Sequence, residues 1–438
     1  MRTRALHNWR AKLGVPGLAL LLAAMPAISQ ESVPADGPPP LSLEPLIELA
    51  IAENPEIREL DRRVEAAEFV VPQAGSLADP RVGVALRSVP VGTLAFDMIP
   101  MTGMDLFAAQ GIPYPGKLRL RKEVARRGAE AVEQLRLEKI NEVVRRVKHA
   151  YLDLYFIDKS ILITLENKRL LESFVEFAQV KYGVGKGVQQ DEVRAQVRVS
   201  EIIDELLRLR QQQISAQAEL NAVLNRPPDS PLGVPGDVVK HKLTISRAAL
   251  EASAIQDRPA LRHVERRVQQ FEAATRLAER DLKPDFDFSV GYRVRARAPG
   301  DPTRGRDWWS ASAAAILPIW AETKQEMRIE EMRANRRAAE AEYEALQTEI
   351  LAKLKDLYAR LERLDREIEL FRTGLIPQAE LSLASARGAY IALEKVDFLT
   401  LLDAQITLYK YQIAYYKAIT EFEKALAELE YVIGQRLY

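Results

Sequence analysis

The sequence predicts a mostly helical chain with a membrane β-barrel part, built from one helix–strand–strand–helix–helix unit that occurs twice. Three observations support this prediction: a repeat at constant spacing, long heptad-patterned segments, and short segments in which apolar and polar residues alternate. Pro55 recurs as Pro259 and Pro80 recurs as Pro284, in both cases 204 residues later. A repeat of this length indicates that both halves of the chain carry the same series of elements.

The spacing of the repeat increases slowly along the chain. Pro113 recurs as Pro318 after 205 residues, and Ala195 recurs as Ala404 after 209 residues. We expect small insertions in loops to cause this increase.

The repeat divides the chain into two units and a linker. The first unit is expected at residues 43–225 and the second at residues 243–438. Residues 226–242 between them are rich in Pro and Gly, which is typical of a linker.

The chain begins with a segment typical of a secretory signal peptide. Residues 1–29 carry four basic residues and no acidic residue, and an apolar run precedes the small residue Ser29. An N-terminal membrane anchor is the alternative, but two prolines interrupt the run, and it is shorter than the roughly 20 residues of a spanning helix. We expect cleavage near Ser29, export of the chain, and a Pro-rich tail at residues 30–42.

The composition excludes several classes of function. Lys+Arg and Asp+Glu both number 62, so the overall charge gives no argument for nucleic-acid binding. The chain has no cysteine, which excludes disulfides, thiolate metal sites and cysteine nucleophiles. Patterns of nucleotide-binding loops, zinc proteases and serine hydrolases are missing too. We expect no enzymatic activity and no cofactor.

The first unit opens with a helix and two strands. The helix is expected at residues 44–70, ended by Pro72 and Gly75. Alternation of apolar and polar or small residues predicts a strand at about 81–89, and a second strand is expected at about 104–112.

A long helical hairpin completes the first unit at about residues 117–224. Its outgoing helix, 117–181, would be about 100 Å long at 1.5 Å per residue. Gly183, Gly185 and Gly187 predict the turn, and a return helix follows.

The second unit repeats this order. A helix is expected up to Asp281, strands at about 285–297 and 308–317, and long helices at about 322–437 that turn near residues 391–395. Pro113, Pro115, Gly116 and Pro318 mark the places where strands lead into helices.

The strand at 285–297 has two contrasting faces. Six apolar residues alternate with polar and charged ones, and a strand of 9–11 residues can cross a bilayer when tilted. A half-buried strand of a soluble sheet is the alternative. In a membrane barrel, the charged residues of these strands would face the lumen: Arg81, Arg87, Asp287, Arg293 and Arg295.

Four strands are too few for a closed barrel. Single-chain membrane barrels begin at about eight strands, and an open edge in lipid leaves backbone groups unpaired. No stretch after the first 29 residues approaches 20 apolar residues, so a membrane role must use strands. Several copies must then share one barrel, and the sequence alone does not choose between two and three.

Two heptad seams require partner helices. Both seams step by four and three residues: Val143, Val147, Ala150, Leu154, Ile157 and Ile161 in the first unit, and Ile350, Leu354, Leu357, Leu361, Leu364 and Ile368 in the second. Their periodicity alone also fits an ordinary antiparallel coiled coil.

The chain resembles the TolC-like outer-membrane efflux proteins. The resemblance rests on the signal peptide, the duplicated order of elements, Tyr182–Gly185 with the downstream Asp191 and Ala195, and Asp397–Gln405. The segment Gln110–Lys117 is similar to one in the heavy-metal efflux branch of the family.

The resemblance implies a homotrimer with a twelve-stranded barrel and a twelve-helix tunnel. Such a protein is the passive exit duct of a tripartite pump that exports small molecules or metal cations. It lies in the outer-membrane lipid of a Gram-negative-type cell, with its helices in the periplasm. Its partners would be a periplasmic adaptor (membrane fusion) protein and an inner-membrane transporter of the resistance-nodulation-division type. A soluble periplasmic coiled-coil scaffold or adaptor is the alternative.

The resemblance also implies functional positions. The adaptor would dock at the tips of the hairpins: Val184, Gly185, Gly187, Leu393, Glu394 and Lys395. Leu393 stands where the family often has glycine. Asp403 corresponds to an acidic residue of the periplasmic aperture, and Thr400 lies three positions earlier. Alternatively, Asp403 faces solvent or pairs with a lysine.

Three methionines are weak candidates for metal ligands. Met98, Met101 and Met104 lie within seven residues, and thioethers bind soft ions such as Cu(I). The segment is expected to be a loop between strands, where methionine can simply pack. We therefore expect no bound metal here, and any metal specificity in the partner transporter.

Overall fold

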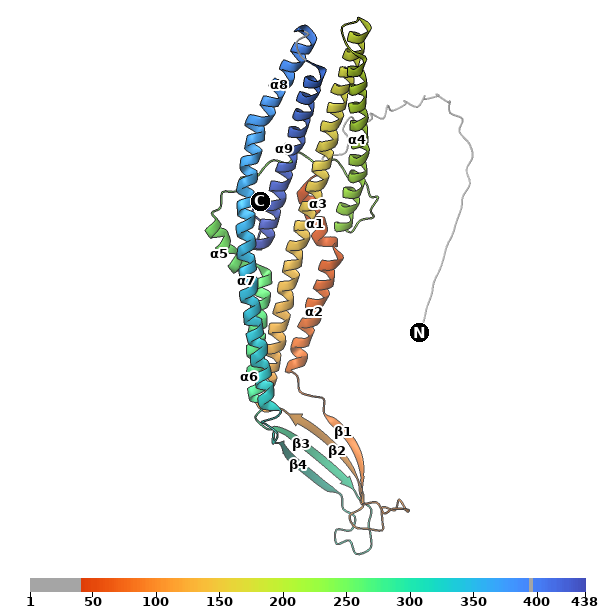
Figure 1. Ribbon diagram of the computed structural model, residues 1–438. Coiled ribbons are helices and arrows are strands. Elements are labelled where there is room, and N and C mark those ends of the chain that lie inside the picture. Colours follow the sequence, from red (N-terminus) through yellow and green to blue (C-terminus); the bar gives the residue numbers. More distant parts are fainter. Residues whose placement is uncertain (1–40, 394–396) are drawn as a thin grey trace, which may run out of the picture. The chain divides into compact units, whose positions relative to one another are not determined.

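The computed structural model describes residues 41–393 and 397–438. The expected signal peptide, most of the Pro-rich tail, and Glu394 and Lys395 of the second tip lie outside the described residues. The described part is mostly helical and carries a four-stranded antiparallel sheet (Figure 1). Both repeats belong to one compact unit.

The opening helix of the first unit is divided in two, which differs from the single helix expected at 44–70. Helix α1 spans Leu43–Glu53 and α2 spans Pro55–Gly75. Asn54 between them is extended, as a residue before proline prefers, and its side chain accepts a hydrogen bond from the N–H of Glu56 at 2.9 Å. Pro72 lies inside α2 one turn before its end and does not stop the helix.

The second unit opens in the same way. Helix α5 spans Arg247–Asp257 and α6 spans Pro259–Arg280. Arg258, before the proline, is extended like Asn54. The repeat is therefore preserved in the break as well as in the helices.

The sheet combines both units. Its strands are β1 (Arg81–Arg87), β2 (Gly103–Ile112), β3 (Asp285–Val294) and β4 (Trp308–Ile316), in the order β1-β2-β3-β4 with antiparallel pairing throughout. The central pair, β2 and β3, joins the first unit to the second. Strand β3 ends three residues before the predicted limit, because its pairing with β2 stops at Met104 and Val294.

Long helices follow the strands in each unit. In the first, α3 (Lys117–Gly183) turns into α4 (Gln189–Val223). In the second, α7 (Gln325–Leu370), η1 (Phe371–Leu375), α8 (Ile376–Gly388) and η2 (Ala389–Leu393) lead to α9 (Phe398–Ile433). The segments η1 and η2 are π-helical.

The two π-helical segments explain part of the increase in repeat spacing. Ile161 and Ile368 are 207 residues apart, whereas Ala195 and Ala404 are 209 apart. Both π segments lie between these positions, and α3 is α-helical throughout. A π turn adds one residue to a helix, so two turns account for two residues. The loop insertions that we expected are not needed for this part of the increase.

The heptad seams form the cores of the helical part. All six seam residues of the second unit are buried in a cluster with residues of α5, α6 and α9. In the first unit, Val143, Val147, Ala150 and Leu154 are buried with residues of α1 and α4, and Ile157 packs at the edge of that cluster. Within the described ranges, no helix is apolar over the length that crossing a membrane requires.

Candidate functional site

The strand register brings four of the five predicted lumen residues to one face of the sheet: Arg81, Arg87, Asp287 and Arg293. They form ion pairs across the strands. Arg81 Nη2 lies 3.5 Å from Asp287 Oδ1. Arg87 Nε and Arg293 Nε lie 3.0 and 2.5 Å from the two carboxylate oxygens of Asp105. Ion pairs therefore connect the strands on this polar face.

Asp105 is a central residue of the polar face that the sequence analysis did not identify. It connects β1 to β3 through its two arginine partners. The sequence does contain an indication of this role, because Asp105 is the one charged residue of β2. Its position in the alternation places it on the side opposite Met104 and Leu106.

Arg295 does not join the polar face. It comes directly after β3, and its side chain is only 1% exposed. Its guanidinium lies 3.0 Å from Asp301, donates to Thr303 Oγ1 at 3.0 Å, and stacks 4.1 Å from the centre of the Trp308 ring. The side chain thus anchors the loop between β3 and β4, and the predicted lumen position was wrong for this residue.

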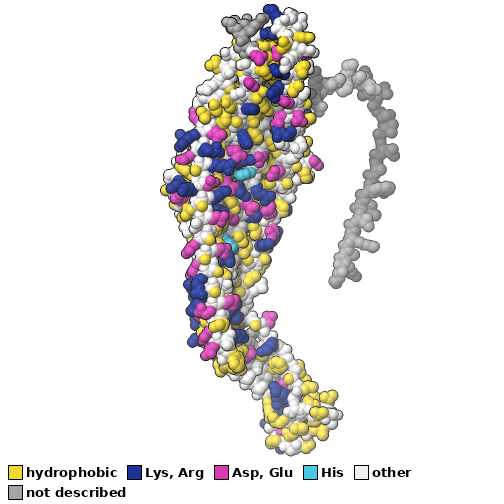
Figure 2. All heavy atoms as spheres, in the orientation of Figure 1, with side chains coloured by type: hydrophobic (Ala, Val, Ile, Leu, Met, Phe, Trp, Pro, Cys, Tyr) yellow, Lys and Arg dark blue, Asp and Glu magenta, His cyan; other side chains and the backbone are white. Residues whose placement is uncertain are grey.

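The opposite face of the sheet is apolar and exposed. Val82 is 80% exposed and Trp309 is 76% exposed, and Val84, Leu86 and Val290 are exposed too. Figure 2 shows hydrophobic side chains gathered at the strand end of the molecule, with basic and acidic side chains among them. A soluble sheet normally buries such a face, so this one requires a covering that the described chain does not supply.

The two outer edges of the sheet are open. β1 pairs only with β2, and β4 pairs only with β3, within the residues that the structure describes. Every residue of β4 is exposed. Each edge therefore presents backbone groups that can pair with a strand of another molecule.

The first hairpin tip is built around glycine. Gly185 has φ of 72°, a conformation that glycine adopts without steric cost, and no atom lies within 4 Å of the place where a Cβ would stand. Gly187 is needed for space, because a Cβ there would lie 3.0 Å from Lys181 Cβ. Val184, directly before Gly185, is 65% exposed.

The second tip contacts the first. Lys181 Nζ donates to the carbonyl of Tyr390 at 2.5 Å and lies 3.8 Å from the centre of its ring. Burial, and then the nearby carboxylate of Asp397, raise the pKa of Asp191. Leu393 is the last residue of η2. Its side chain, and the tip residues Glu394 and Lys395, are not among the parts of the chain that the structure describes. The end of α3 at the first tip is thus in contact with η2 of the second hairpin.

Asp403 and Thr400 lie together on the exposed side of α9. They are three residues apart on the helix, which places them on one face. Their neighbours Leu401, Leu402 and Ala404 are buried in a cluster that includes residues of α3. Asp403 has no hydrogen bond or ion pair with any residue described, so the alternative of a lysine partner is not observed within one chain.

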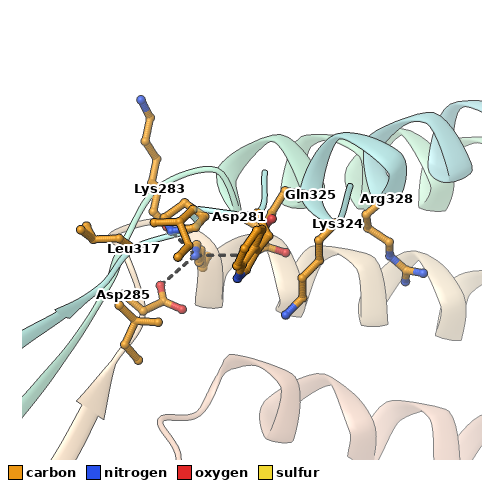
Figure 3. Close-up of a pocket in the computed structure, with 12 residues that line it drawn as sticks. Asp281, Lys283, Asp285, Leu317, Lys324, Gln325 and Arg328 are labelled. Atoms are coloured by element: carbon orange, nitrogen blue, oxygen red, sulfur yellow. Dashed lines mark hydrogen bonds and ion pairs between the residues drawn. The ribbon is translucent and has the colours of Figure 1, made fainter. Parts of the chain in front are cut away.

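The junction between β2 and α3 is fixed by the buried Lys117, whose acidic partners Asp281 and Asp285 are labelled in Figure 3. Pro113 and Pro115 lead to Gly116, whose φ is 94°, and Lys117 begins the helix. The Lys117 side chain is only 3% exposed. Its Nζ lies 2.8 Å from Asp285 Oδ1 and 3.4 Å from Asp281 Oδ1.

Backbone groups complete this junction. Lys117 Nζ donates to the carbonyl of Lys283 at 2.9 Å, and the N–H of Tyr114 donates to Asp285 Oδ1 at 2.8 Å. Lys117 and its acidic partners line a cavity of about 460 Å³ together with Pro318 and the start of α7. The junction residues of the first unit are therefore tied to the start of β3 in the second.

The candidate metal ligands do not form a defined site. Met98 and Met101 are exposed in the loop before β2, whereas Met104 lies in β2 on the apolar face. Among the described residues, no group of three or more histidines and carboxylates is arranged to hold a metal ion.

The comparisons with known proteins agree with this architecture. The sequence model of a family described as outer membrane efflux protein matches residues 46–226 and 250–435. These two segments correspond to the two repeats. No curated protein matches the chain by sequence.

Solved structures share the fold. The outer membrane protein VceC of Vibrio cholerae has a TM-score of 0.75 and 18% identity, over 90% of this chain and 97% of its own. The outer-membrane channel CmeC of Campylobacter jejuni has a TM-score of 0.72 and 13% identity, over 96% and 94%. The outer membrane channel MtrE of Neisseria gonorrhoeae, in its open state, has a TM-score of 0.72 and 17% identity, over 90% and 89%. The TolC-like fold expected from the sequence is confirmed.

The buried lysine gives a testable prediction for stability. We expect Lys117→Met to lower the free energy of unfolding by about 2–4 kcal/mol, because Asp285 and Asp281 lose their cation. Denaturant unfolding of the detergent-solubilised protein, followed by circular dichroism, measures this change. The control is Lys283→Met, whose side chain is exposed and should matter by less than about 0.5 kcal/mol. Equal effects of the two substitutions would contradict the stabilising role of the Lys117 ion pairs.

Proposed function

The chain belongs to the outer membrane efflux protein family, and we propose that three copies of it form a passive exit duct through the outer membrane of a Gram-negative-type cell. Proteins of this family are channels and not enzymes. They are trimers that work with a periplasmic adaptor and an inner-membrane transporter. The observation that carries the proposal is the exposed apolar face of a sheet whose two edges are open.

Lipid is the covering that this apolar face fits. An exposed face of Val, Leu, Phe and Trp side chains matches the outer surface of a membrane barrel. Hydrocarbon, however, cannot hydrogen bond with the open edges of β1 and β4. If β4 of one copy pairs with β1 of the next, three copies close a barrel of twelve strands and no edge remains.

The polar face fits a water-filled lumen. Its ion pairs, Arg81 with Asp287 and Asp105 with Arg87 and Arg293, are spread over three strands. Charged groups of both signs are compatible with water and too costly for a lipid-facing surface. We therefore assign this face to the interior of the barrel.

The helical part supports closure by other copies as well. Helix α3 packs against α2 on one side and α6 on the other. Its counterpart α7 packs against α6 but makes no comparable contact with α2 in the part of the chain described. In a ring of three copies, α2 of the next copy takes this place.

We propose that the adaptor docks at the hairpin tips, at Val184, Gly185 and Gly187 of the first and Leu393, Glu394 and Lys395 of the second. The exposed Val184 offers an apolar contact directly before the glycine turn at Gly185. We further propose a resistance-nodulation-division type of transporter as the source of energy, because the duct itself carries no nucleotide-binding motif.

The proposed cargo is a small molecule or a metal cation that the transporter selects. The segment Gln110–Lys117, which resembles the heavy-metal branch, builds the junction around Lys117. Its role in the fold is sufficient to explain its residues, so the segment gives no argument for metal as the cargo. A soluble periplasmic scaffold is a poorer fit, because it would leave the apolar face in water.

The proposal is tested by the location and conductance of the protein. We expect it in the outer-membrane fraction as a trimer that dissociates on heating, and we expect purified trimers to conduct ions in planar lipid bilayers. A monomer recovered from the soluble periplasmic fraction would contradict the proposal.

The aperture assignment gives a second prediction. Three copies of Asp403 around one axis attract cations, so we expect Asp403→Asn to lower the cation selectivity of the trimers. The reversal potential in a salt gradient across a planar bilayer measures this change. The control is Glu380→Gln, on an exposed glutamate of α8 that also has no partner among the described residues. An unchanged reversal potential in Asp403→Asn would place this residue away from the pore.

The first tip gives a third prediction. Gly185→Val should abolish efflux while leaving trimers intact, because a β-branched residue does not adopt a φ of 72°. Gly185→Asn is the matched control, since asparagine tolerates this conformation, and it should retain efflux. Accumulation of a fluorescent pump substrate in cells measures efflux. Normal efflux with Gly185→Val would remove the first tip from the docking surface.

A further inference from the structure

The junction around Lys117 is present once in complete form, and the repeat predicts a second. Lys117 stands at the start of α3. Its acidic partner Asp281 caps the end of α6, which packs against α3, and its other partner Asp285 is the first residue of β3. The lysine of the first unit thus binds the carboxylate at the start of β3, a strand of the second unit. If the second unit is built in the same way, its corresponding basic residue should bind the segment at the start of a β1 strand.

Lys324 is the counterpart of Lys117. Arg121, Glu123 and Arg126 of α3 recur 207 residues later as Arg328, Glu330 and Arg333 of α7, and the same spacing relates Lys117 to Lys324. Both lysines directly adjoin the first turn of their helix. The insertion that raises the spacing from 205 to 207 lies just before them, in the turn after Pro318.

The surroundings of the two lysines differ in one respect. Lys117 is buried with its carboxylates, whereas Lys324 is exposed and has no hydrogen bond or ion pair from its side chain to any described residue. Lys324 lines the cavity at the end of β4 with the exposed apolar residues Leu317 and Trp320 (Figure 3). The second junction thus has its cation but lacks the element that would cover it.

The missing element has a counterpart in the first unit. The segment Asp281–Asp285, which leads into β3 and includes its first residue, corresponds to Leu77–Arg81 at the start of β1, with Pro284 matching Pro80. Asp79 in this segment is exposed and has no partner among the described residues. The segment is held in place by a hydrogen bond of 2.8 Å from Gln110 Nε2 to the carbonyl of Ala78.

One chain cannot bring these two groups together. Lys324 follows β4 and Asp79 precedes β1, and these strands are the opposite edges of the sheet. Neighbouring strands lie about 4.8 Å apart, so the two edges are separated by about 14 Å. We propose that Lys324 binds Asp79 of a neighbouring copy of this chain, as Lys117 binds Asp285 within one copy. This inference rests on the proposed function, because it requires copies joined from β4 to β1.

The charge order in the two segments favours this pairing. The first strand residue is Asp285 in the second unit but Arg81 in the first, and the residue before the proline is Lys283 in the second unit but Asp79 in the first. The acidic residue of the first unit therefore stands two positions earlier than the acidic residue of the second. Arg81 is engaged at 3.5 Å with Asp287 on the polar face, which leaves Asp79 as the carboxylate for Lys324.

Crosslinking tests the contact directly, because the chain has no cysteine of its own. The variant Lys324→Cys/Asp79→Cys, in purified trimers, is treated with a short bismaleimide and examined on denaturing gels. We expect covalent dimers and trimers. The control pair Lys324→Cys/Glu68→Cys keeps the first cysteine and moves the second 11 residues back along α2 to another exposed acid, and it should remain monomeric on the gel.

The outcomes separate this inference from the proposed function. If Lys324→Cys/Asp79→Cys forms trimers on native gels but no covalent dimers or trimers, the proposed contact is wrong. The proposal that the protein is a trimer is then unaffected. Monomers on native gels, for the unmodified protein as well, would overturn the proposed function. A monomeric product with an internal crosslink would show that the two residues meet within one chain, which also overturns the inference.

A charge exchange gives an independent measurement. Lys324→Asp and Asp79→Lys should each lower the temperature at which trimers dissociate, because each places like charges together. The double variant restores opposite charges and should recover most of the loss. If the two losses simply add, the residues do not interact and the inference fails.

Discussion

Hydrogen bonding along the outer edges of the sheet is the constraint on which the rest of the structure depends. The chain supplies four strands, and the first and last of them keep unpaired backbone groups. Water can satisfy these groups, but the apolar face beside them is suited to lipid, where no substitute exists. Duplication of the unit doubled the number of strands and still left two edges, so closure needs further copies of the same chain.

The same incompleteness recurs away from the sheet. Helix α3 has neighbours on both sides, while α7 lacks one of the two. Lys117 has its carboxylates, while Lys324 has none within the described chain. Each missing contact has a complete counterpart inside the chain, at the boundary between the two units. That boundary is therefore a physical template for the boundary between copies.

The sequence predicted the elements better than their limits or their contacts. All four expected strands are present, and alternation predicted those at 81–89 and 285–297. In the second of these the alternation continues through Arg295 in the sequence, whereas the strand ends where its neighbour stops pairing. The single helix expected at 44–70 is broken at Asn54, because a residue before proline prefers extended backbone. Burial of Lys117 could not be predicted, because its partners are more than 160 residues away. The tip and aperture positions came from the family resemblance, and the structure places Val184 and Asp403 on exposed surfaces.

The π-helical segments η1 and η2 make the two hairpins of one chain different in local shape. The first hairpin turns through glycine, and the second reaches its turn through a widened helix. A ring of three copies then presents six tips of two alternating kinds, so its symmetry is threefold and not sixfold. A partner with six equivalent subunits would have to bind the two kinds of hairpin in two different ways.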